Sequence, residues 1–409
     1  MDIRAYFRYN VHELAFVIMF ILLFFQSILS DRICYVFSYT DELFAVIGLM
    51  TLSSPYVRKY VFMHNTYVKR IFKLLLVILI IGCLSTIRYK IQSDLMVNLY
   101  DCFALMKMFV ICFLGLSLLY RCSLNKVLEI IFFLVCMYIL LGGIFGILNL
   151  FGDIGMSEEY RFGIRNFRFI NSNSGDYASI LIIALSIVHL QSGMTGKKYI
   201  FLKLLTLFCL ILTLRGKAIG MVLTYTVLIW LLKYYKGISL KSLAILAMIG
   251  FGGAYWQIKF YFVDNITARG LFLLYGLITA NNFFPFGAGF STYGSNMAKV
   301  NYSPLYTEYG FSSYYGMSAE QPQFLNDNFW PMIIAQFGWI SFILYAFILV
   351  LFFKIVNIEF SLKQLKIAGF ILFFLLIYSS IGGPIFVHYI GCASILVFSL
   401  GIVLSQKYK

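Results

Sequence analysis

Two basic residues that interrupt an apolar stretch are the first candidates for chemistry in this sequence. Arg215 ends the uncharged run 208–214 and is followed, after Gly216, by Lys217. Charge at such a place in an apolar segment is costly, which makes an ionisable residue there a functional hypothesis by default. A guanidinium also matches the geometry of phosphate oxygens. We therefore interpret Arg215 and Lys217 as candidate phosphate ligands, with extension of Arg215 to the membrane surface as the structural alternative.

Three further arginines stand close together in the polar segment 151–176. Arg161, Arg165 and Arg168 are spaced four and then three residues apart, which would place them on one face if the segment were helical. The functional interpretation is a second set of phosphate ligands. The structural alternative is a set of surface ion pairs with carboxylates of the same segment, namely Glu158, Glu159 and Asp176.

A second polar segment, 259–330, is rich in aromatic residues, Gly and Pro. Long loops in compact proteins are usually either functional or disordered, and the aromatic content favours order. Flat rings next to Asn, Ser and Gly suit sugar stacking, which makes Tyr309, Tyr314 and Tyr315 candidate sugar-binding residues. The alternative is an aromatic belt or loop core at the membrane surface.

The same segment offers a candidate general base. Asp327 lies immediately before an apolar stretch that begins at 331, where a loop-to-helix junction could hold a carboxylate within reach of a substrate hydroxyl. The structural alternative is that Asp327 caps the N-terminus of that helix. Glu308 is the next candidate base.

The elements that must position these residues are membrane helices. Of the 409 residues, 61% are hydrophobic and 12% are charged, against about 25% charged residues in soluble domains. The mean hydropathy is +0.88. The net charge of +15 does not indicate a nucleic-acid partner, because the Lys and Arg residues lie between apolar stretches instead of forming one basic patch.

The apolar stretches predict an all-α polytopic membrane protein with about twelve transmembrane helices. The expected spans are 12–30, 41–53, 71–87, 100–120, 127–150, 177–193, 199–214, 217–232, 243–258, 331–353, 367–382 and 387–405. Basic residues concentrate in alternate connecting segments, which places both termini in the cytoplasm. This orientation puts 151–176 and 259–330 outside the membrane as two ordered extracytoplasmic loops of a single membrane domain.

Several enzyme motifs are absent from the sequence. It contains no D-x-D pair, no G-x-x-x-x-G-K-[ST] phosphate loop and no H-E-x-x-H. The four His residues have no zinc-site spacing. We therefore expect chemistry on the outer face that needs no metal and no other cofactor.

Four motifs in this order resemble a known family. They are Arg165 before Asn171-Ser-Asn173, then Thr213-Leu-Arg215-Gly-Lys217, then Arg269 before Pro285-Phe-Gly287-Ala-Gly289-Phe, and finally Asp327-Asn-Phe-Trp before Gln336-Phe-Gly338. Together they resemble the Wzy-type polymerases of O-antigen and capsule repeat units, which are related to the O-antigen ligases. Two departures are Leu214, where the family usually has Ser, and Asp327, where the ligases have His.

This resemblance implies a GT-C-like glycosyltransferase of the bacterial cytoplasmic membrane. It would transfer a growing chain from its undecaprenyl diphosphate to an incoming lipid-linked repeat unit. The implied diphosphate ligands are Arg161, Arg165, Arg168, Arg215, Lys217 and Arg269. Asn173 would join the sugar-binding tyrosines, and Asp327, Glu308 and Arg215 would be catalytic. The implied partners are lipid-linked oligosaccharides, membrane lipids, a chain-length regulator and a flippase. The alternatives are a ligase or, in another class, a transporter or flippase of lipid-linked sugars.

Overall fold

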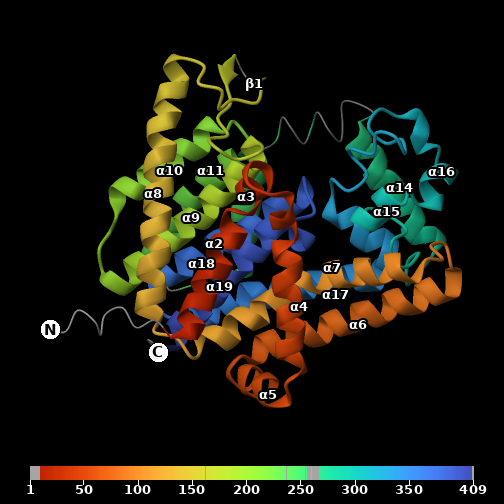
Figure 1. The fold of residues 1–409 in the computed structure, drawn as a ribbon, viewed down its shortest axis with the longest axis horizontal. Coiled ribbons are helices and arrows are strands. Elements are labelled where there is room, and N and C mark those ends of the chain that lie inside the picture. Colours follow the sequence, from red (N-terminus) through yellow and green to blue (C-terminus); the bar gives the residue numbers. More distant parts are fainter. Residues whose placement is uncertain are drawn as a thin grey trace.

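The computed structural model describes residues 10–161, 163–235, 237–253, 255, 259 and 267–407, and within these ranges the chain is predominantly helical (Figure 1). The α-helices are α2 (Val11–Phe24), α3 (Gln26–Arg32), α4 (Thr40–Ser53), α5 (Pro55–His64), α6 (Thr66–Tyr89), α7 (Leu95–Leu119), α8 (Leu124–Phe151), α9 (Ser174–Thr195), α10 (Ile200–Leu212), α11 (Gly216–Tyr234), α12 (Leu240–Gly253), α14 (Ala268–Asn282), α15 (Asn296–Val300), α16 (Pro304–Glu308), α17 (Phe329–Lys354), α18 (Lys363–Ile381) and α19 (Tyr389–Lys407). Shorter elements are the 3-10 helices η1 (Tyr35–Tyr39), η3 (Phe311–Ser313) and η5 (Ile385–Val387), the π-helix η4 (Ile355–Glu359), and the strands β1 (Tyr160–Arg161) and β2 (Ile164–Arg165).

The helices confirm an all-α polytopic membrane protein. In the described ranges, nine helical segments are long and apolar enough to cross a membrane, and the bent pair α2 and α3, 65° apart, would make a tenth. The expected span 199–214 is the 13-residue helix α10, and the described part of 243–258 belongs to the 14-residue helix α12. At about 1.5 Å per residue such helices fall short of a bilayer core of about 30 Å. The expected count of about twelve is therefore not confirmed; residues 254 and 256–258 lie outside the described residues.

Three helices form the centre of the molecule. The most apolar stretches of α9, α18 and α19 are 83%, 78% and 89% buried inside the protein, against 39% for those of α6 and α8. Helix α9 packs on α18, and α19 packs on α7. A helix that is apolar on all sides is either enclosed by protein or surrounded by lipid. The distribution of apolar residues around each helix therefore does not distinguish the central helices from the peripheral ones.

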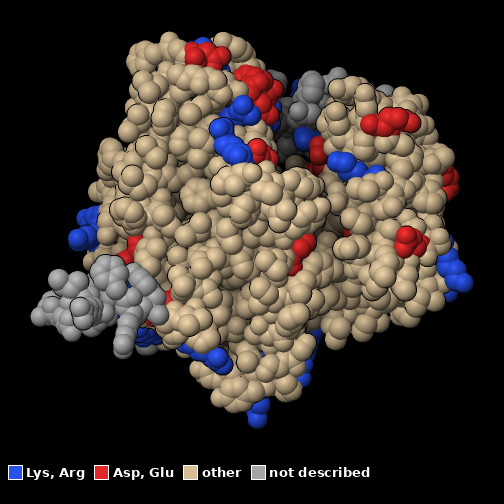
Figure 2. All heavy atoms as spheres, in the orientation of Figure 1, with Lys and Arg blue, Asp and Glu red and all other residues tan. Residues whose placement is uncertain are grey.

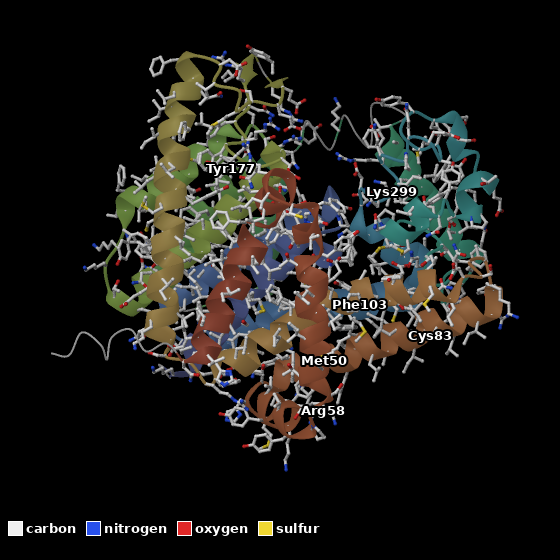
Figure 3. All side chains as sticks on the ribbon, viewed as in Figure 1. Met50, Arg58, Cys83, Phe103, Tyr177 and Lys299 are labelled. Atoms are coloured by element: carbon white, nitrogen blue, oxygen red, sulfur yellow. The ribbon has the colours of Figure 1, made fainter. Side chains whose placement is uncertain are left out.

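The described parts of the two long polar segments lie at one end of the molecule, which we call the upper end. Figure 1 shows β1 and α14–α16 there, and α5 at the opposite end, where Figure 3 places Arg58. Both ends of the described chain contact the turn between α7 and α8, where Asn10 donates to the Arg121 carbonyl (3.0 Å) and Gln406 accepts from Tyr120 (2.8 Å). Segments that the charge pattern assigns to one side thus share one end of the structure.

The described part of 259–330 packs around its own aromatic core. Phe272 stacks on Tyr293 with ring centroids 4.5 Å apart, and the Tyr293 hydroxyl donates to the Phe272 carbonyl (2.6 Å). Tyr306 and Phe311 are fully buried beside them. The aromatic residues therefore do build an ordered segment, and these four act as its core.

The segment 151–176 is not helical around its arginines, so the prediction of one arginine face is wrong. Strands β1 and β2 form an antiparallel hairpin in which Tyr160 pairs with Arg165. Gly163 makes the turn with φ +76°, and the Asn166 side chain accepts from the backbone N–H groups of Glu158 and Glu159 (both 2.9 Å). A glycine turn and a side chain that satisfies the backbone compete with helix formation.

Two sequence motifs that are far apart in the chain meet at a break in α17. The backbone N–H groups of Ala288 and Gly289 donate to the carbonyls of Ala335 and Gln336 (both 2.8 Å), just before Gly338, whose φ is +73° and ψ is −178°. A Cβ on Gly338 would lie 2.1 Å from the Pro285 carbonyl oxygen. The turn 285–290 is thus docked into a gap that only glycine leaves open.

We expect Gly338→Ala to destabilise the protein strongly. The backbone conformation alone disfavours a side chain by about 1–3 kcal/mol, and the overlap with Pro285 adds to that. The thermal unfolding midpoint of the purified protein should fall by several degrees. Gly152→Ala is the matched control, because Gly152 has a φ of −153° and open space around its missing side chain. Equal midpoints for the two variants would contradict this account.

Candidate functional site: a charged pocket at the upper end

A pocket of about 590 Å³ opens at the upper end of the molecule. Figure 2 shows charged side chains of both signs around a hollow between the part that carries β1 and the part that carries α14–α16. The pocket collects six residues predicted from the sequence to form the site, namely Arg161, Asn173, Arg215, Lys217, Arg269 and Asp327. They come from five separate regions of the chain.

Helix N-termini supply much of the pocket wall. Helices α9, α11 and α14 each place residues of their first turn or their N-cap in the pocket, and Asp327 lies two residues before α17. The first backbone N–H groups of a helix are unpaired within the helix and its N-terminal end carries partial positive charge. Converging N-termini therefore favour an anionic ligand in this pocket.

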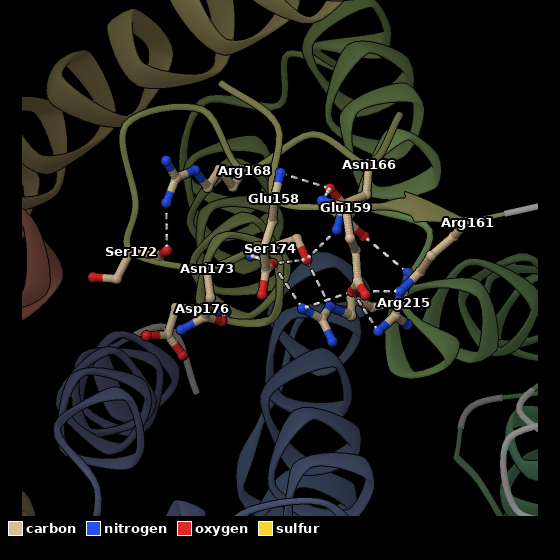
Figure 4. Close-up of polar contacts among 11 residues, drawn as sticks. Glu158, Glu159, Arg161, Asn166, Arg168, Ser172, Asn173, Ser174, Asp176 and Arg215 are labelled. Carbon is tan, nitrogen blue, oxygen red and sulfur yellow. Dashed lines mark hydrogen bonds and ion pairs between the residues drawn. The ribbon is translucent and has the colours of Figure 1, made fainter. Parts of the chain in front are cut away.

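Arg215 is held by a network of hydrogen bonds (Figure 4). Its Nε donates to the Ser174 hydroxyl (2.6 Å), and its Nη2 donates to Glu158 Oε2 (2.8 Å). The same carboxylate oxygen accepts from the backbone N–H of Ser174 (3.0 Å). Within the described chain Nη1 makes no hydrogen bond, so two acceptors, the Ser174 hydroxyl and the Glu158 carboxylate, position the guanidinium and one amino group remains for a ligand.

The Glu158 carboxylate is electrostatically stabilised in this network. Burial alone would raise the pKa of Glu158, but the Ser174 N–H and the Arg215 guanidinium outweigh burial and hold the pKa below its ordinary value. A carboxyl group whose pKa is lowered on folding stabilises the folded state above its unfolded pKa of about 4.3, and this contribution is lost as the pH falls through the lowered value.

We therefore expect Glu158→Gln to change how stability depends on pH. The wild type should be more stable than the variant between about pH 5 and pH 7. The two unfolding curves should converge as the pH falls through the lowered pKa of Glu158 and the wild-type carboxylate becomes protonated. Thermal unfolding of both proteins across this range tests the expectation, and parallel curves at every pH would contradict it.

Two further cations line the pocket. Lys217 Nζ donates to the Ser179 hydroxyl on α9 (2.7 Å). Arg269 Nη2 bonds Asp327 Oδ2 (3.0 Å), which ties the start of α14 to the residue before α17. The helix cap of α17 is Asn328 and has no side-chain capping bond, so Asp327 is not the N-cap. The side chain of Asp327 faces the pocket and Arg269.

The pocket wall combines nearly balanced charges. Four cations, Arg161, Arg215, Lys217 and Arg269, stand against three carboxylates, Glu158, Asp176 and Asp327. The ion pair Arg161–Glu159 (2.6 Å) fits the surface-pairing alternative for this segment, whereas Glu158 pairs with Arg215 from another part of the chain. The arrangement can bind an anion through fixed N–H donors and can offer a carboxylate to a hydroxyl proton.

Six predicted site residues lie outside the pocket. Arg165 is on β2, and Arg168 Nη1 donates to the Ser172 carbonyl (2.8 Å). Glu308 ends α16 and is exposed. The tyrosines belong to the aromatic part of 268–325: Tyr309 stacks on Tyr275 at 4.8 Å, and Tyr314 and Tyr315 are 38% and 77% exposed.

The sequence analysis missed the contribution of the segment between α18 and α19. His388 lines the pocket, as do Gly382, Gly383 and Pro384. Burial lowers the pKa of His388 against the opposing effect of Asp176. A Gly-Gly-Pro break followed by His between two apolar stretches is the signal that could have indicated this segment.

No protein family matches this chain in sequence, and no curated protein is significantly similar to it. Within the described ranges, no group of three or more His, Cys, Asp or Glu side chains is placed to hold a metal ion.

Proposed function

We propose that this protein is a Wzy-type polymerase, a GT-C-like glycosyltransferase that joins undecaprenyl-diphosphate-linked oligosaccharide repeat units into a polysaccharide. The observation that carries the proposal is the meeting of Arg215, Lys217, Arg269 and Asp327 in one pocket. These residues belong to three separate motifs of the family resemblance. The ligase and the transporter remain the alternatives, and no feature of the pocket favours either of them.

In the proposed reaction, the acceptor hydroxyl attacks the anomeric carbon of the donor sugar. The bond from that carbon to the diphosphate oxygen breaks, and the lipid diphosphate leaves with the electron pair. Arg215, Lys217 and Arg269 would stabilise the charge that develops on the phosphate oxygens. The Asp327 carboxylate would accept the hydroxyl proton. The energy comes from the donor's own bond between the anomeric carbon and the diphosphate.

The proposed setting is the outer face of a bacterial cytoplasmic membrane. A chain-length regulator and a flippase are the proposed protein partners, and the membrane lipids surround the helices. A reaction of purified protein with one defined lipid-linked repeat unit tests the function. The expected result is a ladder of polymer lengths without added nucleotide sugar and in the presence of EDTA. A single transfer to a different terminal acceptor, with no ladder, would instead indicate a ligase.

The basic residues also predict the orientation of the chain in the membrane. A reporter fused after Lys241 should be cytoplasmic, and a reporter fused near Tyr309 should be extracytoplasmic, because positively charged segments are retained inside. Paired alkaline phosphatase and green fluorescent protein fusions measure both positions. Opposite signals, or both reporters on one side, would remove the basis for an outer active site.

A further inference from the structure

A second pocket, of about 320 Å³, adjoins the charged pocket. Pro384 and His388 line both pockets, so η5 and its flanking residues form the wall between them. The rest of the second pocket comes from α3, α4, α7, the 294–297 region and α17. We call it the inner pocket.

Two buried glutamines leave their carbonyl oxygens unpartnered in the wall of the inner pocket. Gln26 is 3% exposed and Gln336 is fully buried, and among the described residues Oε1 of each side chain has no hydrogen-bond partner. The amide of Gln26 donates to the Ser38 carbonyl (2.8 Å) and to the Asp41 carboxylate (2.7 Å). The amide of Gln336 donates to the Tyr293 carbonyl (2.8 Å).

These bonds determine which way each amide points. Carbonyl and carboxylate oxygens only accept hydrogen bonds, so a reversed amide would set two acceptors against each other. The side-chain carbonyl oxygens of Gln26 and Gln336 are therefore the atoms that lack a hydrogen-bond partner among the described residues. A buried polar atom without a partner is unfavourable, and a ligand with hydrogen-bond donors would satisfy both.

The charged groups of the inner pocket are also mainly hydrogen-bond acceptors. Three carboxyl groups, Asp41, Glu42 and Asp101, line it together with one ammonium group, Lys107. Lys107 forms ion pairs with both Asp41 and Glu42 (2.8 Å to the latter), so its charge is already matched. A ligand that brings a further carboxylate would meet like charges.

The remaining wall offers flat apolar surfaces. Tyr100, Phe103, Phe337 and Tyr389 line the inner pocket, and Figure 3 shows Phe103 near the middle of the molecule on α7. The volume lies within the range of pockets that enclose small ligands, about 300–1,000 Å³, and exceeds the needs of a single ion. Aromatic rings beside hydrogen-bond acceptors suit a ring that carries hydroxyl groups.

We propose that the inner pocket binds one sugar ring of the lipid-linked substrate and selects a neutral or amino-bearing sugar over one with a carboxylate. The inference rests on the proposed function, because the charged pocket next to it would hold the diphosphate of that substrate. The ring hydroxyls donate to Gln26 and Gln336, and the carboxyl groups repel an acidic sugar.

Binding measurements on the purified full-length protein test this selection. The probes are farnesyl diphosphate, farnesyl-diphospho-N-acetylglucosamine and farnesyl-diphospho-glucuronic acid. We expect the N-acetylglucosamine conjugate to bind roughly tenfold more tightly than farnesyl diphosphate, as two added hydrogen bonds would give. The glucuronic acid conjugate should bind no more tightly than farnesyl diphosphate.

Two variants assign the added affinity to the glutamines. Gln336→Met and Gln26→Met should each reduce the preference for N-acetylglucosamine at least twofold while the affinity for farnesyl diphosphate stays unchanged. Gln336→Met keeps the test valid if loss of the Gln26 amide bonds prevents folding. Gln364→Met is the matched control, because Gln364 lies on α18 outside both pockets and bonds His189 (2.7 Å); its preference should stay at the wild-type value.

Three outcomes would overturn the inference: no added affinity from N-acetylglucosamine, tighter binding of the glucuronic acid conjugate, or an unchanged preference in both pocket variants. A fourth outcome would assign a cation to the pocket and would also overturn the inference. In that outcome sodium chloride raises the thermal unfolding midpoint more than choline chloride does, the pocket variants lose this difference, and the sugar has no effect. A farnesyl diphosphate affinity that does not depend on Arg215 would contradict the proposed function instead, and the sugar preference would still be measurable.

Discussion

Arg215→Lys is expected to lower the polymerisation rate by about a hundredfold or more, the effect of removing one donor from a preorganised oxyanion site. Lysine keeps the positive charge but cannot reproduce the planar fork that bonds Ser174 and Glu158 while one amino group remains for the substrate. The rate of ladder formation by the purified protein measures the effect. The amount of protein in the membrane should stay at the wild-type level.

Glu158→Gln separates a substrate role of Arg215 from a purely structural one. If Arg215 served only to anchor the start of α9 through Glu158, removing either charge of their ion pair would have the same effect. We expect Glu158→Gln to retain most of the activity, because an amide oxygen still accepts hydrogen bonds from the guanidinium. Wild-type chain lengths from Arg215→Ala would contradict the assignment of this arginine to the diphosphate.

Asp327→Asn is expected to lower the rate by about 10²- to 10⁴-fold, the usual contribution of a general base. The asparagine oxygen can still accept from Arg269, which now donates to Asp327 at 3.0 Å, but the amide cannot take a proton. Because Asp327 does not cap α17, the thermal unfolding midpoint should change little. The rate of ladder formation and the unfolding midpoint, measured on the same preparation, test both statements.

Two other carboxylates make the Asp327 test specific. Asp153→Asn changes an exposed carboxylate in the other polar segment and should leave the rate unaltered. Glu308→Gln changes the competing candidate base, which lies outside the charged pocket, and should also have little effect. An active Asp327→Asn enzyme together with an inactive Glu308→Gln enzyme would move the base to Glu308.

The residues of the charged pocket could be predicted where charge occurred against an apolar background. Arg215 and Lys217 were conspicuous because they follow an uncharged run, and Asp327 because it precedes one. Arg161, Arg165 and Arg168 were harder to place, because their spacing fits a helix while Gly163 and Asn166 favour a hairpin. That hairpin directs Arg161 into the pocket and leaves the other two arginines outside it.

The amino-acid composition was sufficient to predict the fold class, because helices of predominantly apolar residues satisfy their own backbone hydrogen bonds and can cross a membrane. Charge against an apolar background also singled out Arg215 and Asp327, and the family resemblance added the motif around Arg269. Which motifs meet became visible only in the folded chain, where the turn 285–290 docks at Gly338 and His388 lines both pockets. Such contacts depend on how the apolar helices pack against one another. When every face of a helix is apolar, the periodicity of its sequence does not indicate which helices it packs against.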